Sequence, residues 1–341
     1  MNALRTRRVA TARLTQQITD LRDEGEPVLF VHGNVSTSAF WHTSLTALPD
    51  RYRPIAVDLR GFGGTDPLPV DATRGVRDYA DDLAALLDTL GIDGAHLVGW
   101  SMGGGVAMQF LRDRPAAVRS LSLVSPVSPY GFGGTRGPEG TLNSPDGAGS
   151  GGGTANPEFV RLLAEGDRGE DSPLSPRAVL ASCYVKPPLR PAHEDTYVEA
   201  MLTTRTGDGH YPGDSTPSDA WPGVAPGTRG VLNCLAPVHF RVDDLHLVEP
   251  KPPVLWIRGE DDVIVADTSL FDLAHLGSVG AVPGWDGTPA QPMVAQTRHV
   301  LDRYAAAGGS VREVAVPGAG HAVHLERPEE FGAALAEVLS A

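Results

Sequence analysis

Residues 99–103 read Gly99-Trp100-Ser101-Met102-Gly103, between an apolar run at 96–98 and a helical stretch that continues to about Asp113. This is a G-x-S-x-G sequence, and the strand before it with the helix after it is the context that the motif requires. A serine on so sharp a turn projects its hydroxyl away from its own backbone, because glycines two positions to either side let strand and helix approach closely. Unpaired N–H groups at the start of the helix also lie near the serine oxygen. The stretch therefore predicts that Ser101 is a nucleophile.

Strand and helix patterns alternate outward from this turn. Continuous apolar runs, typical of strands buried on both faces, occur at 28–31, 55–57 and 253–257, and further strands are expected at 118–124 and 311–316. Apolar residues at helical spacing occur at 79–90 and 328–339. This alternation predicts an α/β fold with a mostly parallel central sheet flanked by helices.

The alternation stops after Pro126. Ten glycines stand between Gly131 and Gly153, which is too many for a packed helix or strand, so we expect a long loop that forms a mobile flap over the active site. Helices are expected near 157–165, 176–184 and 194–204. We therefore predict a core made of residues 1–126 and 251–341, with an inserted cap, or lid, at 127–250.

The composition excludes several classes of partner. Acidic residues outnumber basic ones by 42 to 28, and the resulting charge of −14 disfavours nucleic acids and anionic membrane surfaces. Residues 1–20 lack the apolar segment of a secretory signal, and no apolar run reaches the roughly 20 residues that span a bilayer, so we expect a cytoplasmic protein. Cys183 and Cys234 are isolated, and the G-x-G-x-x-G match at 147–152 does not follow a strand. We expect neither a metal nor a cofactor, and the oligomeric state is not predicted.

A serine nucleophile needs a base, and the base needs a carboxylate that orients it. Two histidines in the loop after the last predicted strand are candidates for the base, His321 and His324. Three acids follow the predicted strand at 253–257 and are candidates for the carboxylate: Glu260, Asp261 and Asp262.

Five motifs, in this order along the chain, resemble those of the α/β-hydrolase superfamily. His32-Gly33-Asn34 resembles its oxyanion loop, the segment 58–63 (Asp-Leu-Arg-Gly-Phe-Gly) its DxRGxG turn, and 99–103 its nucleophile elbow. The segment 259–262 (Gly-Glu-Asp-Asp) resembles the acid turn, and Gly320-His321 followed by 326–328 (Glu-Arg-Pro) resembles the histidine loop. The resemblance implies the α/β-hydrolase fold, with an inserted cap.

The same resemblance selects among the candidates. The histidine directly after Gly320 is the base in the family, which implies His321, and the family's GxxD spacing implies Asp262 with Asp261 as the alternative. The backbone N–H groups of Asn34 and Met102 are the implied oxyanion hole. The chain departs from the family in its connection from acid to base, which is long at 59 residues. We expect the excess, near 269–294, to be a further lid element or a loop on an oligomer surface.

The implied activity is hydrolysis of a small-molecule carboxylic ester or lactone through an acyl-serine intermediate. The stretches GFGGT (131–135) and GGGTANPEF (151–159), with the elbow GWSMG, are similar to intracellular polyhydroxybutyrate depolymerase-like hydrolases, which implies a hydroxyalkanoate ester. The same triad also serves C–C bond hydrolysis, perhydrolysis and amide cleavage. A ligand receptor built on a hydrolase scaffold is the alternative from another class, and fold alone does not decide between them.

Overall fold

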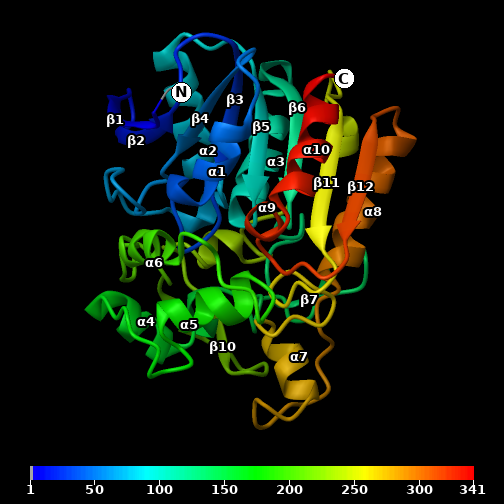
Figure 1. The fold of residues 1–341 in the computed structure, drawn as a ribbon. Coiled ribbons are helices and arrows are strands. Elements are labelled where there is room, and N and C mark those ends of the chain that lie inside the picture. The colour runs from blue at the N-terminus through cyan, green and yellow to red at the C-terminus, as the bar shows by residue number, and fades with distance from the viewer. Residues whose placement is uncertain (1–2) are drawn as a thin grey trace.

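The computed structural model describes residues 3–341 and contains an eight-stranded sheet with the order β1-β2-β4-β3-β5-β6-β11-β12 (Figure 1). The pairs β1–β2 and β2–β4 are antiparallel, and every other pair is parallel. The prediction of a mostly parallel sheet is therefore confirmed. The strands are β1 (Arg5–Ala10), β2 (Thr15–Asp20), β3 (Glu26–Val31), β4 (Tyr52–Val57), β5 (Ala95–Trp100), β6 (Val118–Val124), β11 (Val254–Gly259) and β12 (Val311–Val316).

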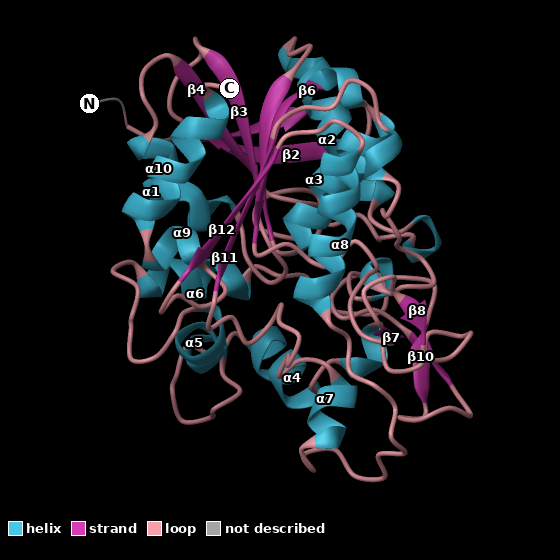
Figure 2. Cartoon of the chain, turned by 90° about the vertical axis from the view of Figure 1, so that its right-hand side faces the viewer, coloured by secondary structure: helices cyan, strands magenta, loops and turns pink. Residues whose placement is uncertain are grey.

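Helices cover both faces of this sheet. One layer holds α1 (His42–Ala47), α9 (Val323–Glu326) and α10 (Pro328–Leu339), and the other holds α2 (Arg77–Leu90), α3 (Met102–Asp113) and α8 (Met293–Ala306) (Figure 2). The central strands are therefore enclosed, and every residue of β5 is buried. Enclosure on both faces explains why these strands are continuous apolar runs rather than alternating ones.

The antiparallel hairpin β1–β2 has no counterpart among the predicted strands. Its outer strand β1 contains Arg5, Arg7 and Arg8, and all but one of its residues are exposed. Charged side chains are common on edge strands, where they discourage pairing with other chains, and they remove the apolar signal on which a prediction depends. Residues 1 and 2 of the predicted core lie outside the described residues.

Residues between β6 and β11 add no strand to the eight-stranded sheet. This segment lies beyond the carboxyl ends of the parallel strands (Figure 1). The predicted helix at 176–184 is divided between α5 and a π-helical turn at Leu180–Tyr184. The cap boundaries at 127 and 250 stay a prediction. The helices and strands between β6 and β11 are β7 (Thr135–Arg136), β8 (Thr141–Leu142), α4 (Pro157–Glu165), α5 (Pro176–Val179), α6 (Glu194–Leu202), β9 (Ser215–Pro217) and β10 (Val224–Pro226).

The glycine-rich segment, which was expected to form a flap, makes hydrogen bonds with two glutamines from a distant part of the chain. Gln296 of α8 accepts hydrogen bonds from Ser128 Oγ and Gln291 Nε2, both at 2.7 Å, and donates to the carbonyl oxygen of Gly137 at 3.0 Å. Gln291 Oε1 accepts the backbone N–H of Gly133 at 2.6 Å. The glycines allow close approach: a Cβ at Gly131 would lie 2.5 Å from a neighbouring carbonyl oxygen. The composition correctly predicted an irregular segment, and the mobility of that segment stays a prediction.

The excess connection between β11 and β12 is partly helical, with α7 (Leu273–Ser278) followed by α8. Its exposed side includes Leu270, Phe271, Val279 and Trp285. The glutamines at its end, Gln291 and Gln296, are the residues that hold the glycine-rich segment.

We predict that Gln296→Leu lowers the free energy of unfolding by about 1–3 kcal/mol, because it leaves buried donors and acceptors without partners. Urea unfolding followed by circular dichroism measures the change. The matched control is Asp302→Asn on the exposed side of the same helix, which should change the stability by less than about 0.5 kcal/mol. Equal stabilities for the two variants would contradict the anchoring role.

Candidate active site

Ser101 joins β5 to α3 with a backbone conformation that non-glycine residues rarely adopt, φ 56° and ψ −120°. The turn is held by close backbone packing on both sides. A Cβ at Gly99 would lie 2.3 Å from the carbonyl oxygen of Gly103, and a Cβ at Gly103 would lie 2.4 Å from that of Val31. Such strain, about 1–3 kcal/mol, persists only where the surroundings fix the backbone. Here it presents a partly exposed serine at the end of the central strand.

Asp262 and His321 meet although 59 residues separate them, because they follow the adjacent strands β11 and β12. His321 Nδ1 lies 2.8 Å from Asp262 Oδ2, and both side chains are only 3% exposed. The other oxygen, Oδ1, accepts the backbone N–H groups of Ile264 at 2.7 Å and Val265 at 3.0 Å. The carboxylate is thereby fixed, and His321 keeps Nε2 free to accept a proton.

Trp100 connects this pair to the nucleophile turn. Its indole Nε1 donates to the carbonyl oxygen of His321 at 3.1 Å, and the two rings lie 5.4 Å apart. Within residues 3–341, Ser101 Oγ forms no hydrogen bond with His321. Hydrogen bonds of this kind are often long in the absence of substrate and tighten when it binds. The structure thus brings Asp262 and His321 together, and Trp100 links His321 to the turn that contains Ser101.

The alternative base and acids lie elsewhere. Asp261 is 44% exposed and forms an ion pair with Lys186 Nζ at 2.8 Å, while Glu260 is exposed. His324 is buried against Trp41, with ring centroids 4.2 Å apart, and neither of its ring nitrogens has a hydrogen-bond partner in the part of the chain described. Burial and the neighbouring His321 lower the pKa of His324 to about 3, so it is neutral.

The loop of Asn34 lies directly against the nucleophile turn. A Cβ at Gly33 would lie 3.0 Å from the Cβ of Ser101. In the described chain, the backbone N–H groups of Asn34 and Met102 donate to no other group. Met102 is the first residue of α3, where backbone N–H groups are free by construction. Both donors are therefore available to an oxyanion formed next to Ser101.

His32 orients this loop, a role that the sequence alone did not assign. Its Nδ1 donates to the carbonyl oxygen of Gly33 at 2.7 Å, and its Nε2 accepts the N–H of Leu59 at 3.0 Å. Burial lowers the pKa of His32 to about 4, which keeps the ring neutral and able to make both bonds. The only indication of this role in the sequence was the position of His32 at the end of a buried strand.

Two further residues support the site through contacts that the sequence does not reveal. Glu326 accepts the backbone N–H of Gly320 through Oε1 and that of Lys186 through Oε2, both at 2.8 Å, and burial raises its pKa. Tyr184 donates its hydroxyl to the carbonyl oxygen of Asn34 at 2.9 Å. Glu326 was visible as part of a motif, whereas nothing local in the sequence marks the contact of Tyr184.

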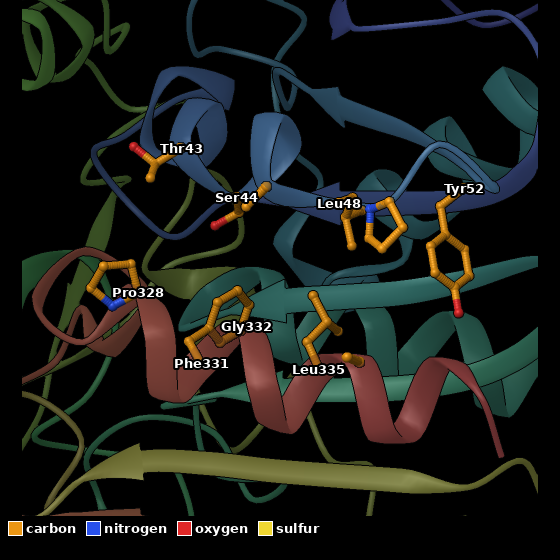
Figure 3. A pocket seen from close by; sticks show the side chains of 11 residues that line it. Thr43, Ser44, Leu48, Tyr52, Pro328, Phe331, Gly332 and Leu335 are labelled. Carbon is orange, nitrogen blue, oxygen red and sulfur yellow. The ribbon is translucent and has the colours of Figure 1, made fainter.

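A small cavity of about 200 Å³ lies apart from this site, between α1 and α10 (Figure 3). Leu48 and Leu335 face each other across it, and none of Ser101, Asp262 and His321 lines it.

Cys183 and Cys234 are free thiols. Over residues 3–341, no three His, Cys, Asp or Glu side chains are grouped to hold a metal ion, and no helix is long and apolar enough to cross a membrane.

A family model described as the alpha/beta hydrolase fold matches residues 26–148, which include the oxyanion loop and the nucleophile turn. The chain has the α/β-hydrolase fold. The esterase RhEst1 from Rhodococcus sp. ECU1013 superimposes on this chain with a TM-score of 0.61, covering 99% of this chain and 98% of the esterase at 21% identity. At that identity the likeness is one of fold.

Curated relatives match this α/β-hydrolase over about a third of their length. The dihydrolipoyllysine-residue acetyltransferase component of an acetoin cleaving system from Cupriavidus necator is 44% identical over 108 residues, 32% of this chain and 28% of the relative. A Bacillus subtilis protein named as an uncharacterized carboxylesterase, nap, is 32% identical over 117 residues, 34% of this chain and 38% of the relative.

Because its folded-state pKa is about 3, against 6.5 in the unfolded chain, protonation of His324 has no effect on stability well above pH 6.5 and destabilises the fold progressively as the pH falls below that value. We predict that His324→Phe, which keeps an aromatic ring and removes the proton site, reduces the loss of stability between pH 7.5 and pH 5 by about 2 kcal/mol. Urea unfolding at the two pH values tests this. An acid-induced loss equal to that of the wild type would contradict it.

Proposed function

We propose that this α/β-hydrolase is a serine hydrolase that cleaves a carboxylic ester or lactone through an acyl-Ser101 intermediate. The observation that carries the proposal is the buried hydrogen bond of 2.8 Å between His321 Nδ1 and Asp262, at the same edge of the sheet as a serine held on a strained turn. A carboxylate fixed by two backbone N–H groups has a clear use there, because it orients the imidazole and stabilises the imidazolium.

The chemistry proceeds in two halves. His321 Nε2 removes the proton of Ser101 as Oγ attacks the substrate carbonyl carbon, and the N–H groups of Asn34 and Met102 stabilise the oxyanion. Collapse of the tetrahedral intermediate expels the alcohol, which takes the proton from His321. Water then attacks the acyl-enzyme while His321 removes a proton from it, and the carboxylic acid leaves as the proton returns to Ser101. No step in this scheme needs a cofactor or metal.

The substrate is proposed to be a small or medium acyl ester, with a hydroxyalkanoate ester as the first candidate. The segment 127–250 lies beyond the carboxyl ends of the parallel strands (Figure 1), and a cap in this place would limit the size of the acyl group that reaches Ser101. The likeness to an esterase and to a carboxylesterase relative agrees with ester cleavage. Tight ligand binding with negligible turnover would instead favour a receptor.

We predict that the purified protein hydrolyses p-nitrophenyl esters of short to medium acyl chains and that Ser101→Ala lowers kcat by about 10⁴-fold or more. The residual rate comes from binding and the oxyanion donors. Release of p-nitrophenol measures turnover, and the preferred acyl length gives the size of the pocket. Equal, slow rates for both proteins on every ester would rule out simple esterase activity.

The two adjacent aspartates provide a matched test of the acid. We predict that Asp262→Asn lowers kcat by about 10³–10⁴-fold, because the amide favours the wrong imidazole tautomer. Asp261→Asn changes the same atoms one residue earlier, in an exposed ion pair, and should leave kcat within about twofold. Comparable losses in both variants would exclude Asp262 as the specific partner of His321.

A further inference from the structure

Residues 184–186, here called the strap, begin at the last residue of the π-helical turn and contact two of the loops that form the proposed active site. The hydroxyl of Tyr184 reaches the carbonyl oxygens of Asn34 at 2.9 Å and Val35 at 3.3 Å. The backbone oxygen of Tyr184 accepts the N–H of Ala322, next to His321, at 2.8 Å. One residue of the segment between β6 and β11 therefore touches both the oxyanion loop and the histidine loop.

We infer that Tyr184 is a positioning residue that holds the oxyanion loop in its active geometry through its hydroxyl. The inference rests on the proposed function, because it assigns Tyr184 to the donor that Asn34 supplies. Tyr184 does not contact the reacting atoms, so it is not a catalytic residue. Its effect on the reaction passes through the backbone of residues 34 and 35.

The backbone of Val35 shows why this loop needs an external constraint. Val35 is a β-branched residue at φ 47°, a left-handed conformation that costs roughly 1–3 kcal/mol for a residue of this kind. The carbonyl oxygens of Asn34 and Val35 stand on either side of that strained residue. A hydroxyl in contact with both oxygens opposes rotation of the backbone between them, and so fixes the adjoining peptide that carries the Asn34 N–H.

The surroundings of the Tyr184 ring keep its hydroxyl in this place. The ring is buried, with its centroid 5.6 Å from that of Trp100 and 6.2 Å from those of Phe40 and His321. Burial raises the pKa of Tyr184, so the hydroxyl stays protonated and donates at any pH in use. The ring thus lies beside the nucleophile turn and the base, with its proton directed at the oxyanion loop.

Hydrogen bonds on the far side fix the strap itself. Lys186 donates its backbone N–H to Glu326, whose other oxygen accepts the N–H of Gly320, directly before His321. The π-helical turn closes with the N–H of Val185 bonded to the carbonyl oxygen of Leu180 at 3.2 Å. Tyr184 is therefore held by hydrogen bonds that do not involve the oxyanion loop, which a residue needs if it is to position that loop.

The experiment compares Tyr184→Phe with Tyr304→Phe. The control removes the same kind of bond, a buried tyrosine hydroxyl to the carbonyl oxygen of Pro252 at 2.6 Å, on α8 away from the site. Displacement of the Asn34 N–H weakens binding of the transition state and not of the substrate. Tyr184→Phe should therefore lower kcat by about 10- to 100-fold with KM within about twofold. The control should keep both constants within about twofold.

A trifluoromethyl ketone analogue of the best ester gives a readout that general destabilisation would not move. It forms a hemiketal oxyanion on Ser101, so its inhibition constant should rise in Tyr184→Phe by the same factor by which kcat/KM falls. An unchanged kcat, or a rise in KM alone, would overturn the inference, as would an inhibition constant that stays at the wild-type value.

Hydrogen–deuterium exchange separates failure of this inference from failure of the proposed function. In Tyr184→Phe, the peptide that covers residues 32–36 should exchange faster than in wild type and in Tyr304→Phe, whether or not any ester is cleaved. Faster exchange with an inactive wild type would uphold the positioning role and reject the hydrolase. Unchanged exchange with an active wild type would uphold the hydrolase and reject the role of Tyr184.

Discussion

The backbone of Ser101 at φ 56° depends on three chain segments that approach more closely than side chains would allow. Glycines at 99 and 103 make this possible, because a Cβ at either position would collide with backbone atoms of the turn or of β3. The same packing seats the loop after β3 against Ser101, since Gly33 also lies within contact of the serine. The proposed nucleophile and the proposed oxyanion donors are thus fixed by one constraint.

The remaining proposed site residues reach this point through sheet topology. Parallel strands end at a common edge, and ligand sites in open α/β sheets lie outside those carboxyl ends. Asp262 follows β11 and His321 follows β12, so neighbouring strands deliver the acid and base as a buried pair. The family model covers residues 26–148 and therefore the nucleophile and the oxyanion loop. Acid, base and cap lie outside it, which is why their roles rest on geometry and stay proposals.

Elements with strong local signals could be predicted from the sequence. The strand at 118–124 and the helix at 157–165 form with the predicted bounds, because each is delimited by its own apolar pattern and turn residues. The hairpin β1–β2 could not be found, since its stability comes from pairing at a polar edge. The contacts of the glycine-rich segment could not be predicted, because its hydrogen-bond partners Gln291 and Gln296 lie more than 150 residues later.

The site residues also divide into those that the sequence predicts and those that depend on tertiary contacts. Family spacing selected Asp262 from three adjacent acids, and the structure places it, rather than Asp261, in a hydrogen bond with His321. Tyr184 and its contact with Asn34 are separated by 150 residues, and no periodicity or motif links them. Supporting contacts of this kind are tertiary, so they follow from the arrangement of the loops and not from any local pattern.

The most direct test of the central claim is the mass of the protein after reaction with a fluorophosphonate, with the modified residue located by tandem mass spectrometry. The account predicts one adduct per chain, on Ser101, formed rapidly because His321 activates the serine and the oxyanion donors bind the phosphonyl oxygen. It also predicts that His321→Ala slows the reaction strongly. An unmodified protein, or an adduct on another residue, would contradict the assignment of Ser101 as the nucleophile.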